Sequence, residues 1–282
     1  MTTSPTTCEE RLRETLLDVL HAQWRAFGLP LQPSRAATLG SAPLEVIDPE
    51  ALVWCTLEWV PSQPRLREGL HAWLRANRGR LNRQRLNKFA ASAKDDPRVG
   101  LWDRLDRQGP PDPGRDAKAS GEAVSGAATL LLRSRDVLGN DCRSFLIVQL
   151  IGSPRGVRLR DVAQSTSYAY RSVSEAATGW ERAGVVRIRH GHCLLLLPAP
   201  WCEILRCRPA DVVTVDWTAA YTVTLSLLGF LASARMSGFD DTHPLVAAAI
   251  RDADTKLEAT APGVARGSAP GVESLREALQ VQ

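Results

Sequence analysis

The chain has 282 residues, 44% of them apolar and 23% charged, with a formal net charge of +4 at pH 7. This composition is that of a soluble globular protein, and the length is enough for two domains. Residues 1–5 carry neither a basic start nor an apolar run, so a secreted protein is not expected. Six scattered cysteines, several of them in apolar patterns, favour reduced thiols in a bacterial cytoplasm.

Residues 1–106 are predicted to form an N-terminal helical domain with basic helices. Asp48-Pro49-Glu50 is a strong helix start, with the aspartate as cap and proline in the first turn. Helices are expected at residues 7–27, 48–60, 64–77, 81–92 and 97–105. Four tryptophans are expected in the core of this domain, in preference to a ligand-binding box. They are Trp54, Trp59, Trp73 and Trp102.

Positive charge is densest in residues 62–89, which contain eight arginines and lysines but a single acidic residue, Glu68. This segment predicts a second basic surface formed by Arg75, Arg78, Arg80, Arg83, Arg85 and Lys88. Phosphate contacts from such a surface would add sequence-independent, salt-sensitive affinity for nucleic acid. Two alternatives stay open: a solvated basic face, and a docking surface for an acidic protein.

Residues 107–126 are rich in proline, glycine, serine, alanine and aspartate, which predicts a flexible linker. Residues 127–137 follow as a lead-in helix or a strand-like run.

Three helical patterns then come in quick succession, at residues 141–151, 159–164 and 168–183, although a buried strand could show the same apolar run as the first. Asp141 is placed to cap the first helix and Ser167 the third, and Gly184 follows the end of the third. The inward positions of the third helix are Val173, Ala176, Ala177 and Trp180. Two strands joined by a glycine-bearing turn follow, at residues 185–189 and 193–197.

The run LRDVAQSTSYAYRSVSEAATGWERAGVVRIR, residues 159–189, resembles bacterial winged helix-turn-helix regulators of the broad MarR and ArsR types. The similarity rests on "D-V-A" in a short helix, a polar turn, "Y-x-x-x-S-V" opening the third helix, and "A-G-V-V". With its flanks, residues 141–198, it covers about one fifth of the chain. The resemblance implies a winged helix-turn-helix domain at residues 127–200, with a two-stranded wing.

Such a domain binds DNA by placing the start of its third helix in the major groove. Between residues 154 and 192 there are seven arginines and three acidic residues. The expected DNA-binding residues are Arg158, Arg160, Ser167, Tyr170, Arg171, Ser174, Arg187 and Arg189. Arg171 suits a guanine edge, Tyr170 or Ser167 suits a phosphate, and the last two arginines belong to the wing. The alternative is an ordinary solvated face.

Residues 201–258 are predicted to be a C-terminal helical region, and residues 259–282 a tail with a short frayed helix. The stretch at residues 216–235 approaches the length of a membrane span, about 20 residues. Its threonines and serines, and Gly229 in its middle, favour a core or dimer helix instead.

Metal binding and catalysis have little support in the sequence. His190, His192, Cys193, Cys202 and Cys207 are metal-type ligands, but they lack a paired C-x-x-C spacing. No phosphate-binding glycine loop, His–carboxylate pair or nucleophile elbow is present. We therefore expect no cofactor, no metal and no enzymatic activity.

The chain is thus predicted to be mainly α, with the three regions above. The leading hypothesis is a cytoplasmic, homodimeric transcriptional regulator that binds double-stranded DNA and no membrane. The second is an interaction module whose winged helix docks a partner protein. A third is a small-molecule sensor with a pocket between the linker helix and the helix at residues 217–234.

Overall fold

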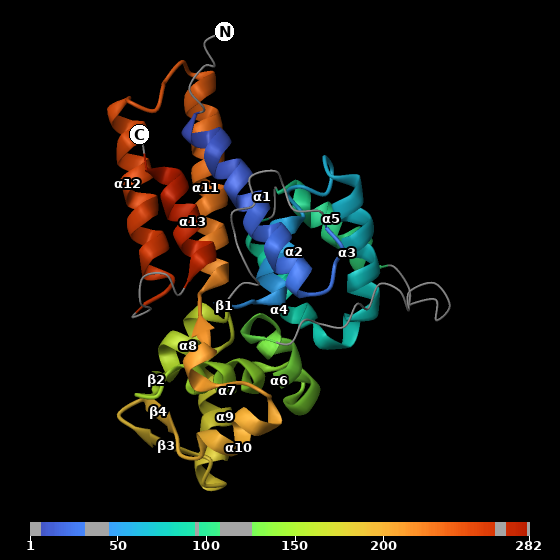
Figure 1. Cartoon of the computed structure of the whole chain (residues 1–282), viewed down its shortest axis with the longest axis vertical. Coiled ribbons are helices and arrows are strands. Elements are labelled where there is room, and N and C mark those ends of the chain that lie inside the picture. Colours follow the sequence, from blue (N-terminus) through green and yellow to red (C-terminus); the bar gives the residue numbers. More distant parts are fainter. Residues whose placement is uncertain (1–6, 32–44, 94–95, 108–125, 263–268, 281–282) are drawn as a thin grey trace.

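The computed structural model describes residues 7–31, 45–93, 96–107, 126–262 and 269–280. These residues are mainly helical, as predicted. They form two bodies that lie one above the other in Figure 1. The expected linker, residues 107–126, falls almost wholly outside the described residues.

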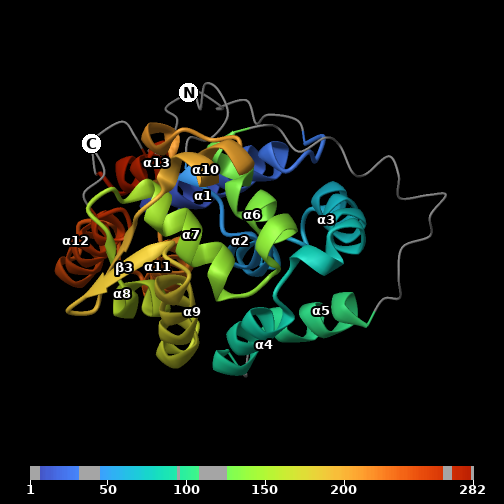
Figure 2. The ribbon, with the colours of Figure 1, turned by 90° about the horizontal axis from the view of Figure 1, so that it is seen from below.

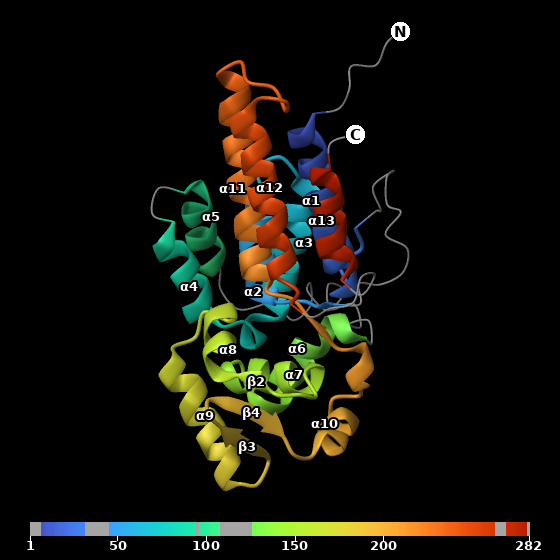
Figure 3. The ribbon, with the colours of Figure 1, turned by 90° about the vertical axis from the view of Figure 1, so that its left-hand side faces the viewer.

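The upper body, called here the helical body, combines helices from both ends of the chain. From the N-terminal part it takes α1 (Cys8–Ala26), α2 (Pro49–Thr56), α3 (Pro64–Ala76), the 3-10 turn η1 (Arg78–Arg80), α4 (Arg83–Ser92) and α5 (Pro97–Asp106). From the C-terminal part it takes α11 (Trp217–Met236), α12 (Pro244–Ala259) and α13 (Pro270–Leu279). The helices α1, α11, α12 and α13 run side by side as a bundle (Figures 1 and 3).

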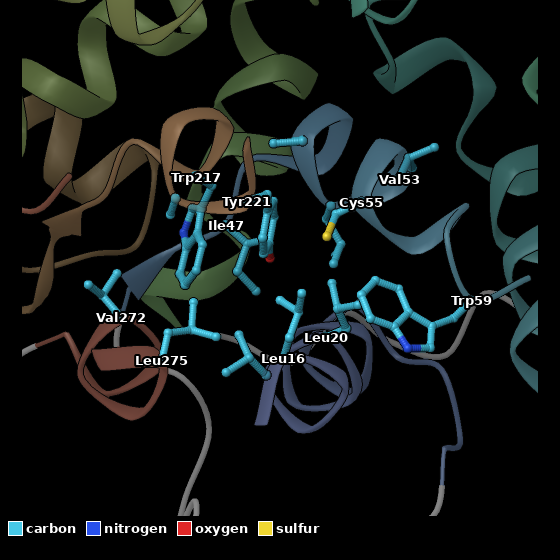
Figure 4. Packing of buried hydrophobic residues seen from close by; sticks show 14 of the residues in the cluster. Leu16, Leu20, Ile47, Val53, Cys55, Trp59, Trp217, Tyr221, Val272 and Leu275 are labelled. Carbon is cyan, nitrogen blue, oxygen red and sulfur yellow. The ribbon is translucent and has the colours of Figure 1, made fainter. Parts of the chain in front are cut away.

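One continuous core joins the two ends of the chain. Figure 4 shows Leu16 and Leu20 of α1 facing Trp217 and Tyr221 of α11, with Leu275 of α13 beside them. This corrects the expected division of the chain, because residues 1–106 and 201–258 do not have separate cores. The short helix expected within residues 259–282 is present as α13, but it is not frayed, because its apolar face is buried against α1.

The predicted helix starts of the helical body form as their sequences dictate. The Asp48 carboxylate accepts hydrogen bonds from the backbone N–H groups of Glu50 and Ala51, and Pro49 occupies the first turn of α2. Three of the four core tryptophans, Trp59, Trp73 and Trp102, are buried as expected, and Trp54 is half-buried against the same core.

The lower body, called here the inserted body, comprises residues 127–212. It begins with the 3-10 turn η2 (Ala127–Thr129) and contains the helices α6 (Leu130–Leu138), α7 (Cys142–Gly152), α8 (Leu159–Ser165), α9 (Tyr170–Arg182) and α10 (Pro198–Ile204). The segment left open between helix and strand is therefore a helix, α6. Strands β2 (Val157–Arg158), β3 (Val186–Arg189) and β4 (His192–Leu195) form an antiparallel sheet in the order β2-β4-β3. The 3-10 turn η3 (Pro209–Asp211) ends this body.

The inserted body has its own core, in which α7 lies against α9 and the sheet. Val173 and Ala177 are fully buried there, whereas Ala176 and Trp180 are only half-buried. The expected cap of the third helix is corrected. Ser167 has a left-handed backbone with φ 58°, so α9 begins at Tyr170, and no side chain caps it. The expected two-stranded hairpin gains a third strand, β2.

A short parallel pair of strands joins the bodies. Strand β1 (Glu45–Val46) leads into α2, and its partner β5 (Val213–Thr214) leads into α11. The two helices that leave this pair therefore start at the boundary between the bodies.

Among the described residues, one helix, α11, is long and apolar enough to cross a membrane by length and composition alone. The core helix of a soluble protein passes the same test, and 44% of its most apolar window is buried within the protein.

Candidate nucleic-acid interface

Helix α9 separates its residues cleanly between core and solvent. Its buried face packs on α7 and α8, while Tyr170 is 53% exposed and the Arg171 side chain 88% exposed. The Arg171 Nε donates to the Glu175 carboxylate one turn on, at 2.7 Å, and this hydrogen bond raises the pKa of Arg171. Ser174 is half-exposed on the same first turns. The start of α9 therefore presents polar groups outward.

The sheet beside α9 carries a row of basic side chains on its outer face. Arg158 of β2 and Arg189 of β3 are both paired with His192 of β4, so the three residues stand in register across the sheet. The Arg158 Nε donates to the His192 Nε2 at 3.0 Å. Arg187 lies on the same outer face, and Arg160 is exposed on α8. Helix α9 and strand β3 lie side by side in Figure 2.

The inner face of the same sheet is apolar, and this fixes which side chains point out. Val157, Cys193 and Ile188 form the neighbouring register row. Cys193 is fully buried, and burial raises the pKa of its thiol to about 11. The Cys193 side chain therefore packs as a small apolar group.

The turn between α8 and α9 is held by the helical body. Lys88 of α4 donates from Nζ to the Ser167 carbonyl oxygen at 2.9 Å. The Tyr168 hydroxyl accepts from the Asn82 amide at 2.8 Å and donates to the Asn140 carbonyl at 3.3 Å. Ser167 thus lies in the turn as a contact point for α4. Tyr168 and Asn82 were not singled out from the sequence, because their partners are distant in the chain.

Arg85, expected on the second basic surface, is instead 1% exposed and lies between the two bodies. Its guanidinium bonds Asp48 at 2.6 Å and Glu50 at 2.5 Å. Arg135 of α6 also bonds the Glu50 carboxylate, at 2.6 Å. Both guanidiniums lie over the Phe145 ring, with centroid distances of 4.4 and 5.3 Å. We call Asp48, Glu50, Arg85 and Arg135 the buried ion cluster.

The charges within the buried ion cluster balance, two against two. Burial alone would raise the pKa of Asp48, but the charge and hydrogen bonds of Arg85 outweigh burial and hold that pKa below its ordinary value. Burial likewise opposes the charge on Arg85, yet Asp48 and Glu50 keep its pKa raised. Removing these charges from water is costly unless each is paired. The arginine therefore serves the junction between the bodies.

The other members of the predicted second surface differ in exposure. Arg80 pairs with Asp136 at 2.7 Å, which offsets its charge. Arg75 and Arg78 are half-buried, while Arg83 and Lys88 are exposed on α4. Burial removes Arg85 from the predicted surface.

No group of three histidine, cysteine or acidic side chains that suits a metal ion occurs in the described residues. His190 is exposed at the turn between β3 and β4, and His192 is engaged by Arg158. His190, His192, Cys193, Cys202 and Cys207 therefore form no such group in this part of the chain.

A cavity of about 700 Å³ runs along α11, beside α2 and α5. Its walls include Trp54, Arg98, Thr218 and, from the turn before α9, Ser167. The Arg98 guanidinium lies over Trp54 at 5.0 Å and is held by Asp96 at 2.5 Å. The cavity borders the helix at residues 217–234, as expected, but among the described residues none of its walls comes from residues 126–138, so it is not the predicted pocket beside the linker helix.

Comparisons with protein-family models, with curated proteins and with solved structures find no match to this chain.

Proposed function

We propose that this chain is a DNA-binding protein, a transcriptional regulator of the bacterial winged-helix kind. Helices α7, α8 and α9 would be its three-helix unit, and the hairpin of β3 and β4 its wing. The observation that carries the proposal is the basic row Arg158–His192–Arg189 on the sheet that packs against α9, together with the exposed start of that helix. Positive charge next to a protruding helix is what binding in a major groove requires.

In this mode α9 enters the major groove by its first turns. Arg171 exchanges its Glu175 partner for the O6 and N7 atoms of a guanine, which a guanidinium contacts in bidentate fashion. Tyr170 and Ser174 contact the neighbouring base edges or phosphates. The DNA backbone is contacted by Arg187 and Arg189 on the hairpin and by Arg158 and Arg160 next to it. These contacts set the orientation of the protein on the duplex.

We further propose a homodimer in the cytoplasm. Helix α11 buries one face in its own protomer, so it is not free to form a whole dimer interface. Exposed apolar side chains lie instead near its end, with Met236 84%, Phe239 42% and Leu245 63% exposed. Exposed apolar groups of this kind are common at contacts between proteins.

A second candidate function is docking of a partner protein on the inserted body. Leu197 and Ile204 are more than half exposed around α10, and Leu194 lies on the outer face of the sheet beside Arg187. An apolar contact there would be insensitive to salt, whereas DNA binding weakens steeply as salt rises. The two functions therefore predict opposite responses to the same titration.

The test is fluorescence anisotropy with a labelled duplex from the region upstream of the chain's own gene. Replacing Arg187 and Arg189 together by alanine should weaken binding and reduce the slope of log K against log salt by about 2, since each phosphate contact contributes about 0.9. Arg208→Ala is the matched control, because this arginine is 82% exposed on the same body and pairs with Asp211. Equal affinity for wild type and the double variant would contradict the assigned interface.

A further inference from the structure

Two cysteines meet at the C-terminal end of α10. The Cys207 N–H donates to the Cys202 carbonyl oxygen at 2.9 Å, and the Arg206 between them has a left-handed backbone with φ 48°. This is the six-residue motif that commonly ends a helix, and it brings the side chains of its two outer residues together. The two thiols are also close enough for a side-chain hydrogen bond between them. A disulfide requires such a close approach, with the two Cα atoms roughly 4.4–6.8 Å apart.

The surroundings hold this loop in place and leave its thiols accessible. Leu205 is 1% exposed in the core of the inserted body. The Arg133 guanidinium of α6 donates to the carbonyl oxygens of Leu205 and Arg206. Cys202 and Cys207 are half-buried, whereas the other four cysteines of the chain are buried. Reagents in solution therefore meet this pair first.

We propose that Cys202 and Cys207 are a modification site, at which a low-molecular-weight disulfide closes an intramolecular disulfide bond. Cys202 is the attacking thiol and Cys207 the resolving one. Burial first, and then the charge and hydrogen bonding of Cys202, raise the pKa of Cys207 to about 11. A raised pKa disfavours the thiolate, which is the nucleophile, so Cys207 is assigned the second, resolving step.

The reaction balances with the small disulfide as the only oxidant. The Cys202 thiolate attacks one sulfur of the small disulfide, forms a mixed disulfide, and releases one small thiol after protonation. The Cys207 thiol then loses its proton and attacks the Cys202 sulfur, which breaks the mixed disulfide and releases the second small thiol. The two protein thiols are oxidised by two electrons, and the small disulfide is reduced to two thiols.

The bond would fix the end of α10 rather than move it, because the two residues are already paired through their backbones. Trp201, next to Cys202, lies with its ring centroid 6.1 Å from that of Trp180 in α9. The form with the disulfide bond therefore holds Trp201 more firmly against Trp180. This inference does not depend on the proposed function, and it can be tested without DNA.

The experiment treats the reduced full chain with oxidised glutathione, blocks free thiols with iodoacetamide, and maps the peptides by mass spectrometry. The wild type should show a bond between Cys202 and Cys207, with the other four cysteines alkylated after denaturation. Cys207→Ser should retain glutathione on Cys202. Cys202→Ser should leave Cys207 unmodified. Oxidised wild type should also unfold at higher urea than reduced wild type, a shift absent from both variants.

Three outcomes would overturn the proposal. One is a stable glutathione adduct on the wild type without ring closure. Another is modification of Cys207 in Cys202→Ser at the same rate as Cys202 in Cys207→Ser. The third is a bond between Cys202 and Cys207 that forms only in urea. Circular dichroism of both serine variants checks that they keep the helical fold.

Discussion

Replacing Glu50 by glutamine removes one charge from the buried ion cluster and changes little else. The Glu50 carboxylate is 0% exposed and accepts hydrogen bonds from Arg85, Arg135 and the Asn82 backbone N–H. Glutamine keeps the shape and one carbonyl oxygen for Asn82. The two guanidiniums are then left with a single carboxylate, that of Asp48, in a site closed to water.

The magnitude follows from the loss of that pairing. Breaking a buried ion pair by removing one partner costs about 3–5 kcal/mol, because the other charge stays buried without compensation. Arg135 is the arginine left without a carboxylate partner, since its other hydrogen bond is to the Arg80 carbonyl oxygen, at 2.6 Å. A domain is typically stable by only about 5–15 kcal/mol, so Glu50→Gln should remove a large part of the free energy of unfolding.

Urea denaturation followed by tryptophan fluorescence measures this change. Arg80→Met is the matched control, because the Arg80–Asp136 pair is 41% and 44% exposed and should contribute about 0–1 kcal/mol. Adding Arg135→Met to Glu50→Gln leaves Arg85 and Asp48 as a balanced pair. The double variant should therefore lose less free energy of unfolding than the two single variants lose in sum. A cost for Glu50→Gln no larger than that of Arg80→Met would refute the reasoning.

Three further predictions concern separate parts of the chain. Burial raises the pKa of the Asp216 carboxyl in the folded protein to about 6. The stability that this carboxyl contributes is therefore complete below its pKa in the unfolded chain, and it is lost as the pH rises through about 6. Asp216→Asn should therefore gain stability relative to wild type between pH 4 and pH 7 in urea titrations, and an unchanged difference would contradict the burial argument. Gly156→Ala should destabilise more than Gly191→Ala in thermal unfolding: both glycines have positive φ, but only at Gly156 would a Cβ lie 2.6 Å from the Cys193 carbonyl oxygen. Arg171→Ala should cost about 1–3 kcal/mol on a preferred duplex and less on a random one, as measured by anisotropy, whereas equal losses on both would remove its assigned role in base recognition.

Local structure was accessible from the sequence because its causes are local. The Asp48-Pro49-Glu50 start of α2 and the glycine after α9 depend on neighbouring backbone groups, and both form where they were expected. The start of α9 was displaced because Ser167 takes a left-handed conformation and receives a hydrogen bond from Lys88. That contact comes from a residue far away in the sequence.

The candidate site was predictable in part. The alternation of the β3 strand places Arg187 and Arg189 outward, and the structure has them exposed. The burial of Arg85 could not be read from a basic run, because it depends on Asp48, Glu50 and Arg135, whose segments meet only in the folded chain. A pair of acids at the start of an otherwise apolar helix was the available signal for that burial.

The order of elements in the two bodies has a consequence for how the protein is made. The inserted body is complete once residue 212 has left the ribosome, with a core drawn almost entirely from residues 130–212. Helix α1 is synthesised before the inserted body, yet its apolar face is covered by α11 and α13, which follow that body in the chain. Helix α1 must therefore wait for these later helices, with its leucines exposed to other chains and to chaperones in the interval.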